Sequence, residues 1–476
     1  MLFPAIVSAI LSSTAAVAAS VERRQTSPNT ALVDLSDNRG TPQHLASGLL
    51  YGILDVPADP NQIPDYFFTD IGFNYARAGG AQLDVPCRGW IWGLNEYECR
   101  FRSTLQNYRL TRKYGGNFVI LPHDIWGTDR ANTSTIWPGD NGNFADYDKF
   151  LDQLISDIEA NEMQAGLVWD IWNEADGVFF GGRPQEQWIN LYTRTHKRIR
   201  SDSKMNSVQI SGPSHASQPA PDNTWWTAWL QRIKSEDTIP DQYSWHIEGD
   251  INNPLDDLQT NNATFASMLS KAEMAQPKIV NINEYATFAE QVAAGAAWWI
   301  SRLERYDAVG IRGNWLSGYR LHDFAASLLG KPNADNSKYN YQAKGYYPNG
   351  EWQVYKYYNR EMTGSRVGTI GTGDRKMDVY ATVDSDMKVR VLAGVRLATG
   401  TWYITINKLS AVGLPPSGSL TIHTLGFVDK GHYGEVDAPT DRGSYAHTYS
   451  GDSVTIAVHQ TSQDQYTAWA FEFSGA

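Results

Sequence analysis

Residues 166–174 read GLVWDIWNE, and residues 278–285 read KIVNINEY. Each is a short apolar run that closes on a polar pair, Asn173-Glu174 in the first and Asn283-Glu284 in the second. Runs of this length are typical of buried parallel strands. A glutamate directly after such a strand is either an exposed loop residue or a functional group at the strand end, and the recurrence of the pair favours the second interpretation.

Six further runs of the same kind occur between residues 45 and 363, which makes eight expected strands. Amphipathic segments separate several of them, and residues 144–162 show apolar side chains at helical spacing with one polar face. Alternating strands and helices predict an α/β fold, and eight such units predict a (β/α)8 TIM barrel over residues 45–363. The expected strands cover residues 46–53, 73–80, 117–124, 166–174, 207–214, 242–249, 278–285 and 309–316.

The pattern changes after residue 363. Short runs with alternating apolar residues replace the helical segments, as in KMDVYATV at 376–383 and SVTIAVHQ at 453–460. This predicts an accessory antiparallel β-sandwich over residues 364–476. Residues 25–44, which include TALVDLSD, are expected to add a strand to it.

The first residues are typical of a secreted protein. Residues 1–19 form an apolar stretch that ends in small residues, so we expect a signal peptide, followed by a short pro-segment at 20–24 that closes on Arg23-Arg24. In a secreted chain, the two cysteines, Cys87 and Cys99, predict one disulfide. Two sequons, at Asn132 and Asn262, predict surface glycans.

The composition argues against several other classes of protein. The formal net charge of −12 disfavours binding to nucleic acid. After the leader, no stretch is long and apolar enough for a membrane span, so a membrane partner is not expected either. The chain has no HExxH motif and too few cysteines for a cysteine zinc site, so we expect neither a metal nor a cofactor.

The fourth and seventh strands of an eight-stranded barrel face each other, so Glu174 and Glu284 are expected to project into one cleft. Paired carboxyl groups are what glycoside hydrolysis requires. In a retaining enzyme they stand about 5–5.5 Å apart, and one attacks the anomeric carbon while the other protonates the leaving oxygen. We therefore expect Glu284 to be the nucleophile and Glu174 the acid/base, with a carbohydrate as substrate.

With these residues, the chain resembles the clan of retaining glycosidases whose catalytic glutamates lie on strands four and seven. Over residues 45–476 it most resembles glycoside hydrolase family 39, which joins the barrel to a β-sandwich. Members of that family commonly have proline after the acid/base, where this chain has Ala175. The resemblance implies O-glycosidic cleavage in plant-type polysaccharide or oligosaccharide, with β-xylosidase- or arabinosidase-like action on pentose-containing substrates.

The resemblance also implies roles for residues at other strand ends. Asn173 is expected to hydrogen-bond the sugar 2-hydroxyl, and Arg77 to lie beneath the nucleophile and keep it ionised. Trp315, at the end of strand eight, is expected to form a platform for the sugar.

Three more residues at strand ends are open to two interpretations. His123 and His246 are either contacts to the sugar or barrel histidines with satisfied hydrogen bonds. Tyr285 is either a site residue or part of the core.

Aromatic residues on loops suggest further contacts. Phe179 and Phe180, in GVFFGGR after Glu174, could line the site of the leaving group, and Trp90 and Trp92 either stack on a sugar chain or pack their loop. An endo-acting glycanase of the same clan is one alternative function. A barrel that binds carbohydrate without cleaving it is another, although such proteins usually lose one of the two carboxylates.

Overall fold

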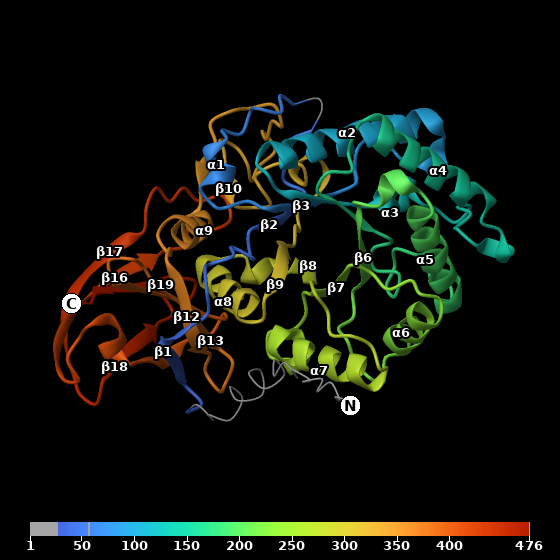
Figure 1. The fold of residues 1–476 in the computed structure, drawn as a ribbon. Coiled ribbons are helices and arrows are strands. Elements are labelled where there is room, and N and C mark those ends of the chain that lie inside the picture. Colours follow the sequence, from blue (N-terminus) through green and yellow to red (C-terminus); the bar gives the residue numbers. More distant parts are fainter. Residues whose placement is uncertain (1–26, 56–57, 476) are drawn as a thin grey trace, which may run out of the picture.

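The computed structural model describes residues 27–55 and 58–475. The expected signal peptide and pro-segment lie outside these residues. Eight parallel strands close into a barrel in chain order, which confirms the predicted α/β barrel fold (Figure 1). The barrel strands are β2 (Gly48–Leu50), β3 (Tyr75–Ala78), β4 (Asn117–Ile120), β5 (Leu167–Asp170), β6 (Gln209–His215), β7 (Gln242–Ile247), β8 (Val280–Tyr285) and β9 (Ala308–Arg312).

Helices surround this barrel (Figure 1). Successive side chains along each strand point to opposite sides of the barrel wall. On β7, Trp245 points outward and packs against Trp226 and Phe265 of two covering helices. The next residue, His246, points to the other side. The helices are α1 (Tyr66–Thr69), α2 (Leu94–Lys113), α3 (Pro122–Trp126), α4 (Ala145–Ala160), α5 (Gln185–Arg200), α6 (Thr224–Ser235), α7 (Leu258–Lys271), α8 (Ala293–Arg305) and α9 (Gly350–Arg360). Within the described ranges, none of them has the length and apolarity needed to cross a bilayer.

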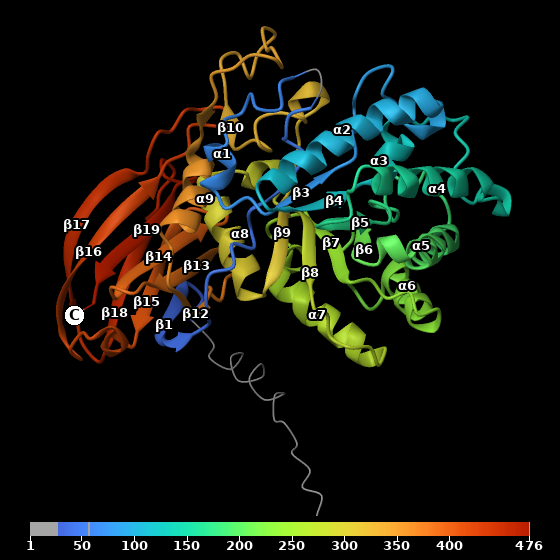
Figure 2. The same ribbon diagram turned by 45° about the horizontal axis from the view of Figure 1, so that its top comes forward.

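Nine strands form a second, separate sheet beside the barrel (Figure 2). Val33 of β1 and Ile404 of β15 come from one half of the sheet, and Val391 of β14 and Phe473 of β19 come from the other half. All four belong to one core, so the sheet folds over on itself as a sandwich. The strands are β1 (Thr30–Asn38), β12 (Ser365–Ile370), β13 (Met377–Val383), β14 (Lys388–Val395), β15 (Gly400–Asn407), β16 (Gly418–Phe427), β17 (Thr440–Tyr449), β18 (Ser453–Gln460) and β19 (Ala468–Ser474).

The sheet is mixed and not purely antiparallel. Strand β1 pairs antiparallel with β12 but parallel with β15, in a register that sets Thr30 opposite Tyr403. A small third sheet joins β10 (Leu329–Gly330) to β11 (Tyr347–Pro348).

Helix α8 is the element that the barrel and the sheet share. It lies between β9 and the strands β13 and β14 (Figure 2), and every residue from Ala293 to Glu304 is buried. Gly394 of β14 allows this contact, because a β-carbon there would collide with the carbonyl oxygen of Ala294.

Candidate active site

Glu174 and Glu284 lie at the carboxyl end of the barrel, where the sequence predicts them. Glu284 is part of β8, and its side chain is 14% exposed. Glu174 follows β5 with its side chain 19% exposed. Its φ of 44° is one that residues other than glycine rarely adopt, and its backbone N–H donates to the carbonyl oxygen of Ser214 at 2.9 Å. Backbone strain of this kind is typical of residues whose direction serves a function.

One histidine connects the two carboxyl groups. His246 lies opposite Glu284 in the pairing of β7 with β8. Its Nδ1 is 2.8 Å from Oε1 of Glu174, and its Nε2 is 3.5 Å from Oε1 of Glu284. Burial alone would lower the pKa of His246, but the charges of Glu284 and Glu174 raise the pKa above its ordinary value. The imidazole is therefore a cation shared between two carboxylates at mildly acidic pH.

Arg77 supports the site from below. It is fully buried on β3, and its guanidinium donates to Glu284 at 2.5 Å, to Asp170 at 2.7 Å and to Asn173 at 2.6 Å. Asn283 completes the network, with its amide 3.1 Å from Oδ2 of Asp170. Such buried, charge-assisted bonds fix the arginine and hold the carboxyl group of Glu284 in place.

The electrostatics of Glu174 favour its charged form. Burial would raise its pKa, but the hydrogen bond and charge of His246 and the charge of Arg77 hold the pKa below its usual value. A general acid must carry a proton when it acts. The unliganded site therefore keeps Glu174 poised as a base, and the acid form requires a change in this environment when substrate binds.

A third glutamate, which the sequence interpretation did not single out, also lies here. Glu248 comes two residues after His246, and oxygen or nitrogen atoms of Glu174, His246, Glu248 and Glu284 all lie within 4.8 Å of one another. Four such groups could hold a cation, but Oε1 of Glu284 and Oε1 of Glu174 already contact Arg77 and His246. Asp170 is the other residue that the sequence analysis missed.

Trp315 and Tyr285, which the sequence also places at strand ends, differ in exposure. Trp315 is 45% exposed after β9, and its indole N–H donates to the carbonyl oxygen of Ala286 at 3.1 Å, two residues beyond Glu284. Tyr285 is instead fully buried, with its hydroxyl group 2.7 Å from that of Tyr355. Of the two interpretations of Tyr285, the structure supports a core residue and not a substrate contact, because strand alternation turns it away from the face that carries Glu284.

His123 lies on helix α3, because Pro122 begins a helix where the sequence predicts that a strand continues. It is buried beside Asp124, and its ring packs 5.9 Å from that of Phe179 and 6.3 Å from that of Trp172. His123 and Phe179 thus pack together beside the site, and no described contact joins either of them to the two glutamates. Phe180 is fully buried against Trp172 and belongs to the core.

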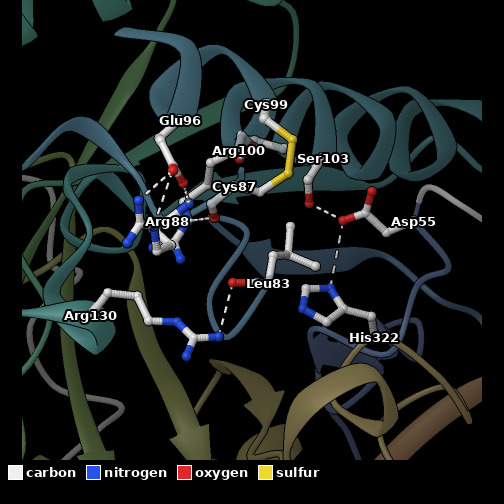
Figure 3. The surroundings of a disulfide bond; sticks show 11 residues. Asp55, Leu83, Cys87, Arg88, Glu96, Cys99, Arg100, Ser103, Arg130 and His322 are labelled. Carbon is white, nitrogen blue, oxygen red and sulfur yellow. Dashed lines mark hydrogen bonds and ion pairs between the residues drawn. A yellow bond between two sulfur atoms is a disulfide. The ribbon is translucent and has the colours of Figure 1, made fainter. Parts of the chain in front are cut away.

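The disulfide joins Cys87 to Cys99 of α2, as predicted (Figure 3). Beside it, Arg88 donates to Glu96 at 2.6 Å, and the guanidinium of Arg88 lies 4.1 Å from the ring of Trp92. Trp90 packs edge-on against Tyr97 and Phe150 and donates to Asp146 at 3.2 Å, so it packs its loop, whereas Trp92 is 38% exposed. Both sequons are accessible: Asn132 is exposed and Asn262 is half-buried on α7.

Comparisons with known proteins agree on the fold. No protein-family model matches the chain, and neither does any curated protein. Among solved structures, the protein N2152 from Neocallimastix frontalis matches with a TM-score of 0.71 at 18% identity, over 94% of this chain and all 100% of that one. A glycoside hydrolase family 30 subfamily 8 xylanase from Clostridium acetobutylicum matches with a TM-score of 0.55 at 13% identity, over 94% and 100%.

A family 39 enzyme from Xanthomonas axonopodis pv. citri matches to a similar degree, with a TM-score of 0.56 at 13% identity, over 96% of this chain and 99% of that chain. Family 39 is therefore one of several glycoside hydrolase families with this architecture and is not singled out. Similarity at this identity shows a shared fold of barrel and accessory sheet.

Proposed function

We propose that this protein is a retaining glycoside hydrolase in which Glu284 is the nucleophile and Glu174 the acid/base. One observation carries the proposal: carboxylate oxygens of the two glutamates lie within 4.8 Å of each other across the barrel. A retaining mechanism needs a separation of about 5–5.5 Å, whereas an inverting enzyme needs about 6.5–9.5 Å to admit a water molecule. The short separation favours double displacement.

In the first step, a carboxylate oxygen of Glu284 forms a bond to the anomeric carbon while the bond to the leaving oxygen breaks. Glu174 gives that oxygen its proton. In the second step, Glu174 takes a proton from water, the water oxygen bonds to the anomeric carbon, and the Glu284 carboxylate is released. Arg77 supports the second step because it stabilises the negative charge that develops on Glu284 as the carboxylate is released.

For the substrate, we propose plant-type polysaccharide or its oligosaccharides, with a leaning to pentose-containing chains. The fold shared with a family 30 xylanase supports this choice. The exposed Trp315 would stack on a sugar ring, whose C–H face matches a flat indole. We also propose that the protein is secreted, begins at Gln25 after processing, and carries glycans on Asn132 and Asn262.

The test is a product assay with purified wild type and Glu284→Gln. Both are incubated with plant and microbial glycans and with aryl glycosides, and released sugars are identified by mass spectrometry. We expect products from wild type and none from Glu284→Gln, because an amide cannot attack the anomeric carbon. Glu186→Gln is the matched control, since Glu186 lies on α5 with its side chain 64% exposed and should leave activity unchanged.

The variant Glu174→Ala tests whether Glu174 is the acid/base. On aryl glycosides whose leaving group needs no acid, azide should restore its turnover and yield a glycosyl azide. Wild-type rates for Glu174→Ala on natural glycosides would contradict the assignment of the acid. Binding of a glycan without release of product by wild type would favour a non-catalytic carbohydrate-binding barrel.

A further inference from the structure

Glu248 has no part in the mechanism described above, although it lies within the site. Strand alternation puts residues two apart on the same side, so Glu248 follows His246 toward the two glutamates. It offers a carboxylate oxygen within 4.8 Å of atoms of Glu174, Glu284 and His246. Three carboxyl groups therefore share the space in which one sugar residue would react.

The surroundings of Glu248 leave one of its oxygens without a partner. Oε1 is buried and makes no hydrogen bond with any described residue. It lies over Gly313, where a β-carbon would collide with it, so glycine at that position makes room for the carboxyl group. A buried polar atom without a partner is costly and uncommon in native proteins. A charged oxygen in this position would cost more than a neutral one, so these surroundings favour the neutral carboxyl group.

The charges that face Glu248 come from several elements. The negative ones are Glu284 on β8, Glu174 after β5 and Glu290 in the turn Phe288–Glu290. Arg77 on β3 is the opposing charge, and His246 lies two residues earlier, on β7. Burial, and then the negative charges of Glu284 and Glu174, raise the pKa of Glu248 well above its usual value. The positive charge of Arg77 opposes this rise but does not reverse it. Carboxyl groups this close do not all ionise.

We propose that Glu248 is a substrate-contacting residue and that its carboxyl group, in the protonated form, binds a hydroxyl group of the reacting sugar. The inference rests on the proposed glycosidase function. A carboxylic acid has one O–H donor and acceptor oxygens, which matches a hydroxyl group that also donates and accepts. A uronate in the same place would face three carboxyl groups, so neutral sugars are favoured.

Two substitutions test the protonation state through activity. Glu248→Gln keeps the shape, a donor and an acceptor without any charge, whereas Glu248→Ala removes the contact. We expect kcat/KM of Glu248→Ala to fall about tenfold below that of Glu248→Gln, which corresponds to one lost hydrogen bond. Equal loss in the two variants would overturn the proposal, because it would mean that the site needs the ionised carboxylate.

Infrared difference spectroscopy gives a readout that needs no substrate. The wild-type spectrum minus that of Glu248→Gln at neutral pH should contain the carbonyl band of a protonated carboxylic acid. In a Glu284→Gln background a neighbouring negative charge is gone, so the pKa of Glu248 should be lower. The band should then disappear at a lower pH than in wild type. Glu186→Gln should leave the band unchanged.

The two experiments separate the two proposals. If wild type hydrolyses no glycan but the band is present, the proposed function fails and the protonated Glu248 stands. A carboxylate band from Glu248 at neutral pH overturns this inference whatever the activity.

Discussion

Arg77 shows at the scale of one residue how the site is held together. Its buried guanidinium contacts Asp170, Asn173 and Glu284, so a single side chain joins β3, β5, β8 and the residues that follow β5. Removing one partner from a buried ion pair typically costs about 3–5 kcal/mol because the other charge is left unpaired. One of these contacts is to Glu284 itself, so stability and the position of the nucleophile depend on one residue.

The charge of His246 should control how activity depends on pH. Its hydrogen bond and charge lower the pKa of Glu174, so as pH rises Glu174 loses its proton at a lower pH than it would without His246. His246→Asn keeps a donor but no charge. Without that charge the pKa of Glu174 rises, and we expect the alkaline limb of the kcat/KM profile to move to higher pH while the maximum falls. An unchanged or lowered limb would contradict this account of Glu174.

Individual residues also show what the sequence can and cannot predict about the site. Glu174, Glu284 and Arg77 are predictable because each is a polar residue at the end of an apolar strand. Asp170 and Glu248 could also have been predicted from the sequence. Asp170 is a charged residue within an apolar run, and Glu248 lies two residues after His246, so the two side chains point to the same side. The contacts of Arg77 follow from barrel closure and are not visible in the sequence.

At the scale of elements, helix α8 decides how barrel and sheet fit together. Gly394→Ala on β14 would push a methyl group against Ala294 and Trp298 of this helix. We expect the free energy of unfolding to fall by about 1–3 kcal/mol, as overpacking typically costs, measured by urea denaturation. Gly418→Ala on β16 is the control, because its nearest neighbours are side-chain atoms of Tyr449 at 3.3–3.4 Å. Equal stability of the two variants would show that α8 and β14 can move apart.

Elements with apolar periodicity are predictable, and those without it are not. Six of the eight barrel strands lie within the segments expected from sequence, and β6 and β9 each extend one residue beyond theirs. Strand β17 has the sequence TDRGSYAHTY, which does not predict a strand, because most of its side chains are at least partly exposed and no alternation marks a buried face. Its place in the sheet comes from pairing with β16, which only the folded chain reveals.

For the whole molecule, buried ion pairs join the two parts. Asp378 of β13 contacts Arg302 at 2.7 Å and also Arg305, both on α8. We expect Asp378→Asn to lower the free energy of unfolding by about 3–5 kcal/mol, because two arginines lose a buried charged partner and only Arg302 keeps another, Asp257. Barrel and sheet should still unfold in one transition by calorimetry.

The control for this prediction is Asp148→Asn. Asp148 pairs with Arg194 on the surface, with side chains 36% and 46% exposed, and such pairs contribute at most about 1 kcal/mol. Two separate transitions in wild type, or a loss no larger than that of the control, would show that the two parts are stable independently.

The most direct test of the proposed chemistry is to trap the covalent intermediate. Wild type is incubated with a panel of 2-deoxy-2-fluoro aryl glycosides, which slow both steps, and the labelled protein is digested and sequenced by mass spectrometry. The account predicts one added sugar on the peptide that contains Glu284, and none in Glu284→Gln. A label on Glu174 or Glu248, or steady turnover of natural glycosides with inversion at the anomeric carbon, would contradict it.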